Sequence, residues 1–168
     1  MARVFLSLGS NLGDRLQYLE DALQRLGATG DIRIVARSRI YETEPWPEVR
    51  VERERWFLNC AVEIETDLPP RRLLRLTQRI ETQAGRGREA SGALYESRSL
   101  DIDILLYGDQ IIADHSLQIP HPLLHERRFV LTPLADIAPQ VEHPTLYQSI
   151  ADLLDALADD RGLVPYGD

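Results

Sequence analysis

Residues 98–108, RSLDIDILLYG, constrain the fold most strongly, because an apolar strand pattern there contains two carboxylates. Successive side chains of a strand point to opposite faces. One face then carries Leu100, Ile102, Ile104 and Leu106, and the other carries Asp101, Asp103, Leu105 and Tyr107. A buried carboxylate is costly unless a cation or hydrogen-bond donor pairs with it. We therefore expect a sheet with helices on the leucine and isoleucine face, and with a polar environment on the aspartate face.

Hydrophobic periodicity predicts further strands over residues 3–8, 32–41 and 56–66, since apolar and polar side chains alternate there. A helix is expected after an N-cap at Asp14, with a stripe of Leu16, Leu19, Leu23 and Leu26. A second helix follows the prolines at 69 and 70, and a short amphipathic helix lies near Ile150 to Leu157. The order βαββαβ predicts an α+β fold of the ferredoxin-like type, an antiparallel sheet with helices plus C-terminal helical additions. One domain over residues 1–168 is expected.

The composition excludes several classes of protein. The net charge of −8 argues against a nucleic-acid binder. All 19 basic residues are arginine, so a Walker-type phosphate loop and a lysine Schiff base are both excluded. An anionic ligand must then be held by arginine, backbone N–H groups or a metal ion. No apolar run reaches membrane-span length and no signal-peptide pattern is present, which predicts a cytoplasmic protein without a membrane partner. The single cysteine, Cys60, is expected to be a buried strand residue.

Asp101 and Asp103 allow two interpretations when taken alone. They are either solvated surface acids, or ligands of Mg²⁺, which takes carboxylate oxygens and completes its shell with water and substrate phosphates. Arg86, Arg88 and Arg98 lie nearby in a stretch that also holds three glycines. Arginines in such a loop suit closure over a polyphosphate, although a solvated charged loop has the same composition.

Other polar and aromatic side chains form a second candidate set. An aromatic ring and an amide on one strand face, Phe57 and Asn59, suit the stacking and hydrogen bonding of a flat heterocycle. Further candidates for ligand contact are Thr43, Pro45, Trp46, Gln78, Glu81, His121, Arg127 and Phe129. Each has an ordinary structural alternative in sheet packing, a helix surface or a turn. The histidines lack zinc-ligand spacing, and no serine or cysteine nucleophile motif is present.

Several motifs together carry a family resemblance. In chain order they are LSLGSNLGDR, YETEPW, FLNCAV, TQRIE, an Arg-x-Arg step, RSLDIDILLYG, IPHP and RRFVLTPLADIAP. This series resembles the 6-hydroxymethyl-7,8-dihydropterin pyrophosphokinases of folate biosynthesis, over about residues 3 to 140. The resemblance implies a ferredoxin-like transferase that moves diphosphate from ATP to the pterin hydroxymethyl group and releases AMP.

The resemblance also implies roles for individual residues. Asp101 and Asp103 are expected to bind two Mg²⁺ ions, and Arg86 and Arg98 to assist catalysis at the phosphates. The pterin is expected to contact Thr43, Pro45, Trp46, Phe57, Asn59 and Phe129. ATP is expected to contact Gln78, Glu81, Arg88, Ile104, His121 and Arg127. No nucleic acid or membrane partner is implied, and no oligomer is required.

Two other classes remain open from the residues alone. One is a ferredoxin-like module that binds a ligand without catalysis, which is favoured if both aspartates are merely solvated. The other is a nucleotidyltransferase, since paired acids on this topology also serve that chemistry. Release of AMP or of pyrophosphate distinguishes the two enzymes.

Overall fold

The computed structural model describes residues 1–45, 52–85 and 99–167. Its centre is an antiparallel sheet with the strand order β5-β1-β4-β3-β8, in which β2 also pairs with β4. The strands of this sheet are β1 (Ala2–Ser10), β2 (Ile32–Arg37), β3 (Tyr41–Thr43), β4 (Phe57–Thr66), β5 (Asp101–Tyr107) and β8 (Leu163–Pro165). A small hairpin pairs β6 (Ile112–Ala113) with β7 (Gln118–Ile119). The α+β class and the antiparallel sheet are therefore confirmed.

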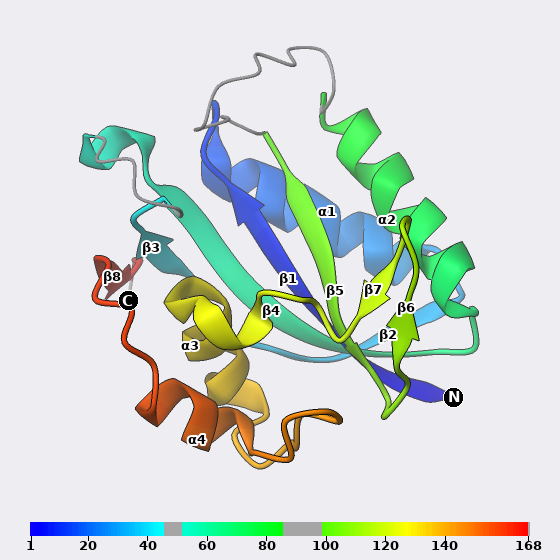
Figure 1. The fold of residues 1–168 in the computed structure, drawn as a ribbon. Coiled ribbons are helices and arrows are strands. Elements are labelled where there is room, and N and C mark those ends of the chain that lie inside the picture. Colours follow the sequence, from blue (N-terminus) through cyan, green and yellow to red (C-terminus); the bar gives the residue numbers. More distant parts are fainter. Residues whose placement is uncertain (46–51, 86–98, 168) are drawn as a thin grey trace.

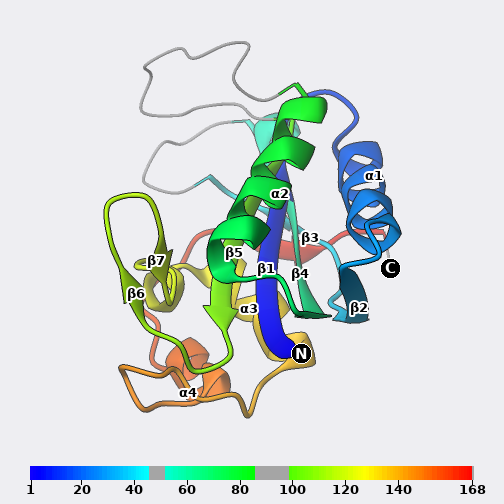
Figure 2. The same cartoon turned by 90° about the vertical axis from the view of Figure 1, so that its right-hand side faces the viewer.

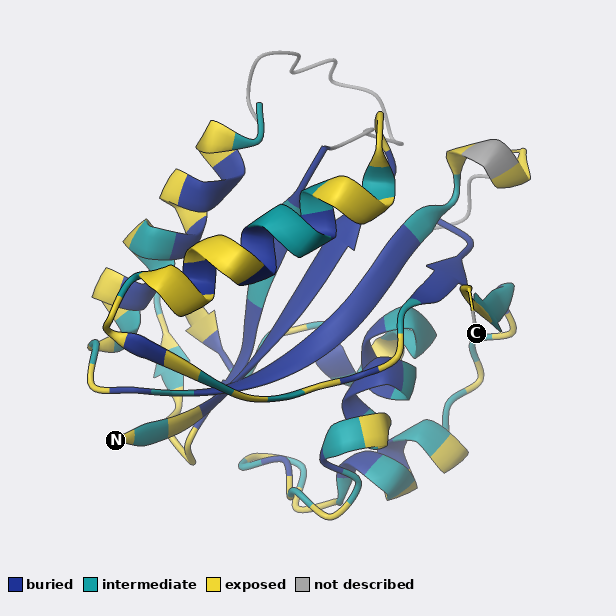
Figure 3. Ribbon diagram, turned by 180° about the vertical axis from the view of Figure 1, so that it is seen from behind, coloured by how far each residue is buried: buried dark blue, intermediate teal, exposed yellow. Residues whose placement is uncertain are grey.

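Helices cover both faces of this sheet (Figures 1 and 2). They are α1 (Arg15–Ala28), α2 (Pro70–Gln83), α3 (Arg128–Ile137) and α4 (Ile150–Asp155), with short 3-10 turns η1 (Arg53–Arg55) and η2 (Leu124–Glu126). The first two helices pack on one face, where their leucines meet the apolar side of β1, β4 and β5. The other two pack on the opposite face against Phe5, Ala61 and Leu105. Figure 3 shows α1 and α2 alternating between exposed and buried residues above a buried sheet.

The predicted start of α1 is confirmed, because the Asp14 carboxylate caps the helix by accepting a hydrogen bond from the Gln17 N–H at 3.1 Å. Three leucines of the predicted stripe, Leu19, Leu23 and Leu26, are buried. Leu16, in the first turn of α1, is exposed instead. No helix among the described residues has the length and apolar character needed to cross a membrane.

Two strand predictions are wrong because each strand contains an extra residue that its partner strand skips. The expected strand over 32–41 divides into β2 and β3, because Arg37 pairs with Val62 and Tyr41 with Asn59, which leaves one extra residue between them. Ser38 fills this irregularity by bonding both backbone groups of Ala61. An inserted residue shifts the alternation of side chains, so the sequence period is lost at that point.

The second irregularity lies in β5. Leu6 pairs with Ile104 but Phe5 pairs with Leu106, so Leu105 is an extra residue. Leu106 therefore packs with α3 and α4, while Tyr107 joins the core beneath α1 and α2, the reverse of the predicted faces. Residues 100 to 104 precede the bulge, and there the predicted alternation is confirmed.

Candidate functional site

Asp101 and Asp103 lie on the sheet face opposite the core that Ile102 and Ile104 help to form. Asp101 pairs with Gly9 of β1, and Asp103 pairs with Ser7. Both aspartates are partly buried, and the Asp103 side chain is 32% exposed. These carboxylates lie at the start of β5, and their partial exposure leaves an approach from solvent.

His121 lies next to Asp103, with 3.9 Å between its Nε2 and the Asp103 Oδ2. Its backbone N–H donates to Leu105 O at 3.0 Å, which fixes the turn after the cis Ile119–Pro120 bond against β5. Its Nδ1 accepts from the Leu123 N–H at 3.1 Å, so the neutral ring carries its proton on Nε2. Burial lowers the pKa of His121 to about 4, assisted by Arg127 and opposed by Asp101. Near neutral pH the ring is therefore an uncharged donor that faces the acids.

Arg127 supplies positive charge to the same region. Burial lowers the pKa of its guanidinium from the ordinary value, while Asp103 and Asp101 act to raise it. Arginine side chains in proteins stay protonated near neutral pH, so the group carries a positive charge. Its guanidinium also lies 5.5 Å from the centre of the Phe129 ring. We call Asp101, Asp103, His121 and Arg127 the acid cluster.

A second group of side chains lies on the same sheet face and is called the amide cluster, Thr43, Phe57 and Asn59. Asn59 and Thr43 are 4% and 1% exposed, and the Asn59 Nδ2 donates to Thr43 Oγ1 at 2.6 Å. Phe57 pairs with Thr43 across the strands and is partly buried. Pro45, two residues after Thr43 in the chain, is also buried. The amide cluster therefore combines an aromatic ring with a rigidly held amide.

Gly9 brings the two clusters together. It pairs with Asn59 on one side and with Asp101 on the other, so the three residues form a row across β4, β1 and β5. A side chain on Gly9 would be impossible without rearrangement, since its Cβ would lie 2.5 Å from Asn59 Oδ1. Neighbouring strands are about 5 Å apart, so the backbones that carry Asn59 and Asp101 lie roughly 10 Å apart, on either side of Gly9.

Gln78 and Glu81 lie differently on α2 although they are three residues apart. Gln78 is exposed, whereas Glu81 is 2% exposed and its Oε2 accepts from the Ile102 N–H at 2.8 Å. That N–H belongs to the residue between the two aspartates, so Glu81 fixes the backbone that carries them. Ile104 packs in the core beneath the helices, which leaves only its backbone to face a ligand. Trp46, Arg86, Arg88 and Arg98 lie outside the described residues, and their assignments stay predictions.

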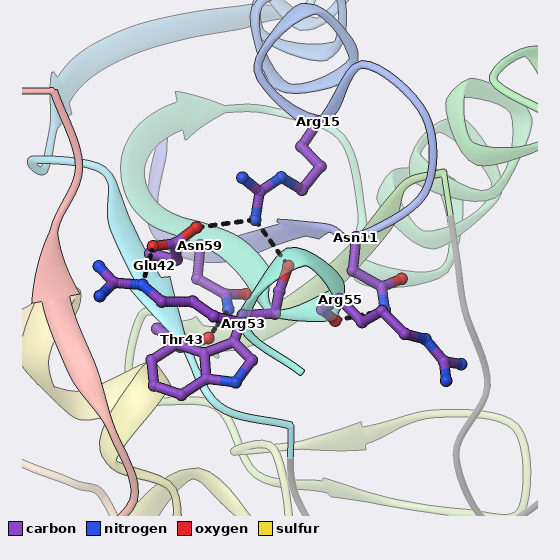
Figure 4. A network of polar contacts seen from close by, with 8 residues as sticks. Asn11, Arg15, Glu42, Thr43, Arg53, Arg55 and Asn59 are labelled. Carbon is purple, nitrogen blue, oxygen red and sulfur yellow. Dashed lines mark hydrogen bonds and ion pairs between the residues drawn. The ribbon is translucent and has the colours of Figure 1, made fainter. Parts of the chain in front are cut away.

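The contacts that support the amide cluster from behind were not predicted from the sequence (Figure 4). Glu42 accepts from Arg15 at 3.1 Å and from Arg53 at 2.8 Å. Arg15 also donates to Trp56 O at 2.8 Å, and Asn11 donates to Arg55 O at 3.2 Å. These bonds fasten η1 and the start of β4 to α1 and β3. Asn11 and Arg15 are part of the GSNLGDR motif, but nothing local in the sequence indicates their distant partners.

Comparisons with known proteins give a family model and named relatives that match this chain. Residues 5–139 match the model of the family described as 7,8-dihydro-6-hydroxymethylpterin-pyrophosphokinase. The chain is 45% identical over 141 residues to the 2-amino-4-hydroxy-6-hydroxymethyldihydropteridine pyrophosphokinase of Methylorubrum extorquens, covering 84% of this chain and 85% of the relative. It is 46% identical over 138 residues to the enzyme of the same name from Bacillus subtilis, covering 82% and 79%.

Solved structures show the same fold at lower identity. The crystal structure of wild-type Plasmodium falciparum HPPK-DHPS with pteroate superposes with a TM-score of 0.70 at 18% identity. The match covers 92% of this chain but 42% of that one, so the present chain spans less than half of that longer protein. From the extent of the family match and the identity to its relatives, the chain belongs to the family of 7,8-dihydro-6-hydroxymethylpterin-pyrophosphokinases.

Proposed function

We propose that this protein transfers diphosphate from ATP to the hydroxymethyl group of 6-hydroxymethyl-7,8-dihydropterin and releases AMP, as a transferase of folate biosynthesis. The observation that carries the proposal is the row Asn59–Gly9–Asp101, which brings the amide cluster and the acid cluster onto one sheet face. A heterocycle held at the first cluster would direct its substituent toward phosphates held at the second. The names of the relatives support the same reaction.

The amide cluster suits a pterin. One Nδ2–H of Asn59 donates to Thr43, which leaves the Oδ1 to accept from an amino or ring N–H group and the second Nδ2–H to donate. Phe57 lies beside it to stack on a flat ring, and Phe129 lies at the start of α3 on the same side of the sheet. A buried amide with fixed orientation favours a ligand with a complementary hydrogen-bonding edge, since an unmatched polar edge would stay unpaired.

The acid cluster suits ATP with Mg²⁺. Two carboxylates on one strand face, with an open approach, are the donors that Mg²⁺ takes when substrate phosphates complete its shell. Asp101 and Asp103 would hold the metal, which would neutralise phosphate charge when bound. We propose two ions there. Arg127 adds fixed positive charge, and the neutral His121 can donate from Nε2 to a phosphate oxygen.

The proposed step is an in-line displacement at the β-phosphorus of ATP. The pterin hydroxyl oxygen forms a bond to that phosphorus, and the bond from phosphorus to the α,β-bridging oxygen breaks. The hydroxyl proton passes to solvent, and AMP leaves with the electron pair of the broken bond. The protein contributes mainly positioning and electrostatic stabilisation, so no side chain is assigned as a strong general base. Arg86 and Arg98 are proposed to stabilise the developing charge.

A product assay tests this function. ATP, Mg²⁺ and the hydroxymethyl pterin should yield equal amounts of AMP and pterin diphosphate. Asp101→Asn and Asp103→Asn should each lose most of the turnover while keeping the circular dichroism of the folded protein. Asp109→Asn, an exposed acid just beyond β5, is the matched control and should keep full turnover. Pyrophosphate release would instead support a nucleotidyltransferase, and absence of any product would support a non-catalytic binding module.

Wider features of the protein are also proposed. The pairing order β5-β1-β4 continued by β2 and β3, with α1 and α2 on one face, supports a ferredoxin-like arrangement as one catalytic domain. We propose that α3, α4 and β8 are additions to that core. A cytoplasmic location, with ATP and the pterin as the only partners and no required oligomer, stays a prediction from the sequence.

A further inference from the structure

The C-terminal strap, which we define as residues 159–166, lies beyond the family match over residues 5–139. It contains β8, which pairs antiparallel with β3 so that Leu163 is opposite Thr43 of the amide cluster. Glu44, the residue after Thr43, exchanges two hydrogen bonds with Gly162 of the strap. The Glu44 N–H donates to Gly162 O at 2.9 Å, and the Gly162 N–H donates to the Glu44 Oε1 at 3.0 Å. The segment from Thr43 to Pro45 is thus fastened to the strap.

The other end of the strap is attached to the start of α3. The Asp159 Oδ2 accepts from the Arg128 N–H at 3.1 Å, and the Arg128 Nη1 donates to Arg161 O at 3.2 Å. Asp159 also accepts from the Arg161 N–H at 3.0 Å, which fixes the turn between the two attachments. Arg128 lies between Arg127 and Phe129 in the chain. The bonds to Arg128 therefore fix the backbone that carries these two candidate ligand-binding residues.

The middle of the strap is in close contact with the residue before Phe57. A Cβ on Gly162 would lie 2.3 Å from Cη2 of the Trp56 ring, so only glycine allows this approach. Arg15 holds the backbone of Trp56 by donating to its carbonyl oxygen. Arg15 also lies 5.8 Å from the centre of the Tyr166 ring. The strap therefore contacts three segments that are separate in the sequence, 43–45, 56–57 and 127–129.

We propose that the C-terminal strap is a positioning element for the pterin, which sets the spacing between the amide cluster and Phe129 without touching the substrate. Gly162 and Asp159 are its positioning residues. The inference depends on the proposed function for the identity of the ligand. A strap with this role controls affinity for the flat substrate more than affinity for ATP, because its contacts with Glu44 and Trp56 lie beside the amide cluster and only its contact with Arg128 borders the acid cluster, at Arg127.

The test measures the Kd of the pterin and the KM of each substrate in Gly162→Ala. The added Cβ displaces Trp56, so the Kd and KM for the pterin should rise about tenfold, as expected for a sub-ångström to ångström misplacement of binding groups. The KM for ATP and kcat should change by less than about twofold. Gly27→Ala in α1 is the matched control, because its Cβ would meet only Ile34 Cδ1 at an ordinary 3.7 Å. Its pterin Kd should equal that of the wild type.

Two further variants separate positioning from general damage. Trp56→Leu removes the ring atoms that the new Cβ would meet, so Gly162→Ala should have no additional effect on pterin Kd in that background. Asp159→Ala releases the end of the strap at Arg128 and should also raise the pterin Kd, with a smaller rise in the KM for ATP because Arg127 is the neighbouring residue, which keeps the test informative if Gly162→Ala fails to fold. Equal loss of affinity for both substrates, or an unchanged pterin Kd in both single variants, would overturn the inference. Absence of wild-type turnover would instead refute the proposed function.

Discussion

Replacement of Glu81 distinguishes a structural role, in which its side chain holds β5, from the direct ATP contact that the family resemblance implies. Glu81 is buried and its carboxylate accepts from the Ile102 N–H between the two aspartates. Glu81→Ala removes this charge-assisted bond and leaves a buried donor unpaired, which costs about 1 to 3 kcal/mol, with a further lost-packing contribution. We expect about 3 kcal/mol of lost unfolding free energy in total. At a urea slope of about 2 kcal/mol/M, the unfolding midpoint falls by roughly 1.5 M.

The assay is urea unfolding followed by circular dichroism, together with steady-state kinetics. Glu81→Gln keeps an acceptor oxygen and should lose only about 1 kcal/mol, with β5 and turnover largely retained. Gln78→Ala, on the exposed side of the same helix, is the stability control and should lie within about 0.5 kcal/mol of the wild type. An unchanged midpoint in Glu81→Ala, combined with lost ATP affinity in Glu81→Gln, would refute the structural role and support direct nucleotide contact.

Three other predictions follow from single contacts. Gly9→Ala places a Cβ against Asn59 Oδ1, so KM for the pterin should rise about tenfold or more in steady-state assays, and a KM within twofold of wild type would contradict the close approach. Burial raises the pKa of the Cys60 thiol to about 12, so a thiol reagent at pH 8 should modify it only after unfolding in guanidinium, and rapid labelling of the folded protein would disprove this. Burial, aided by His125, lowers the pKa of His143 below its ordinary 6.5, so as pH falls through that value the unfolded chain takes up the proton first. The wild type should therefore lose unfolding free energy relative to His143→Asn below that pH, measured by urea unfolding at pH 7.5 and 5, and parallel pH profiles would rule this out.

Local sequence patterns predict those parts of the fold in which one face of an element is uniformly apolar. The alternation in β4 predicts that Leu58, Cys60, Val62 and Ile64 enter one core, and all four do. The N-cap at Asp14 and the stripe of α1 are predictable for the same reason, since each depends on residues within a few positions. The alternation of Asp101 and Asp103 against Ile102 and Ile104 is also local, and it is confirmed.

Inserted residues limit this kind of prediction. Leu105 is as apolar as its neighbours, so nothing in the string LLY indicates that the partner strand skips it. The division of β2 from β3 depends on Ser38 bonding Ala61, which is 23 positions away. Both irregularities are decided by pairing register, and register is a property of two strands that one strand's pattern cannot contain.

Register also explains why individual candidate residues could be proposed from the sequence while their arrangement in space could not. Asp101, Asn59 and Gly9 come from three distant segments, and each has an ordinary alternative role where it stands. Pairing of β1 with β4 and β5 brings them into one row, and the absent side chain of Gly9 lets Asn59 approach the strand that borders the acids. Glu81 then holds β5 from the helix side, and the C-terminal strap holds β3 from the opposite edge of the sheet. The candidate chemistry therefore depends on register more than on any single functional group, because a shift of β1 by one residue would turn Gly9 away from both partners.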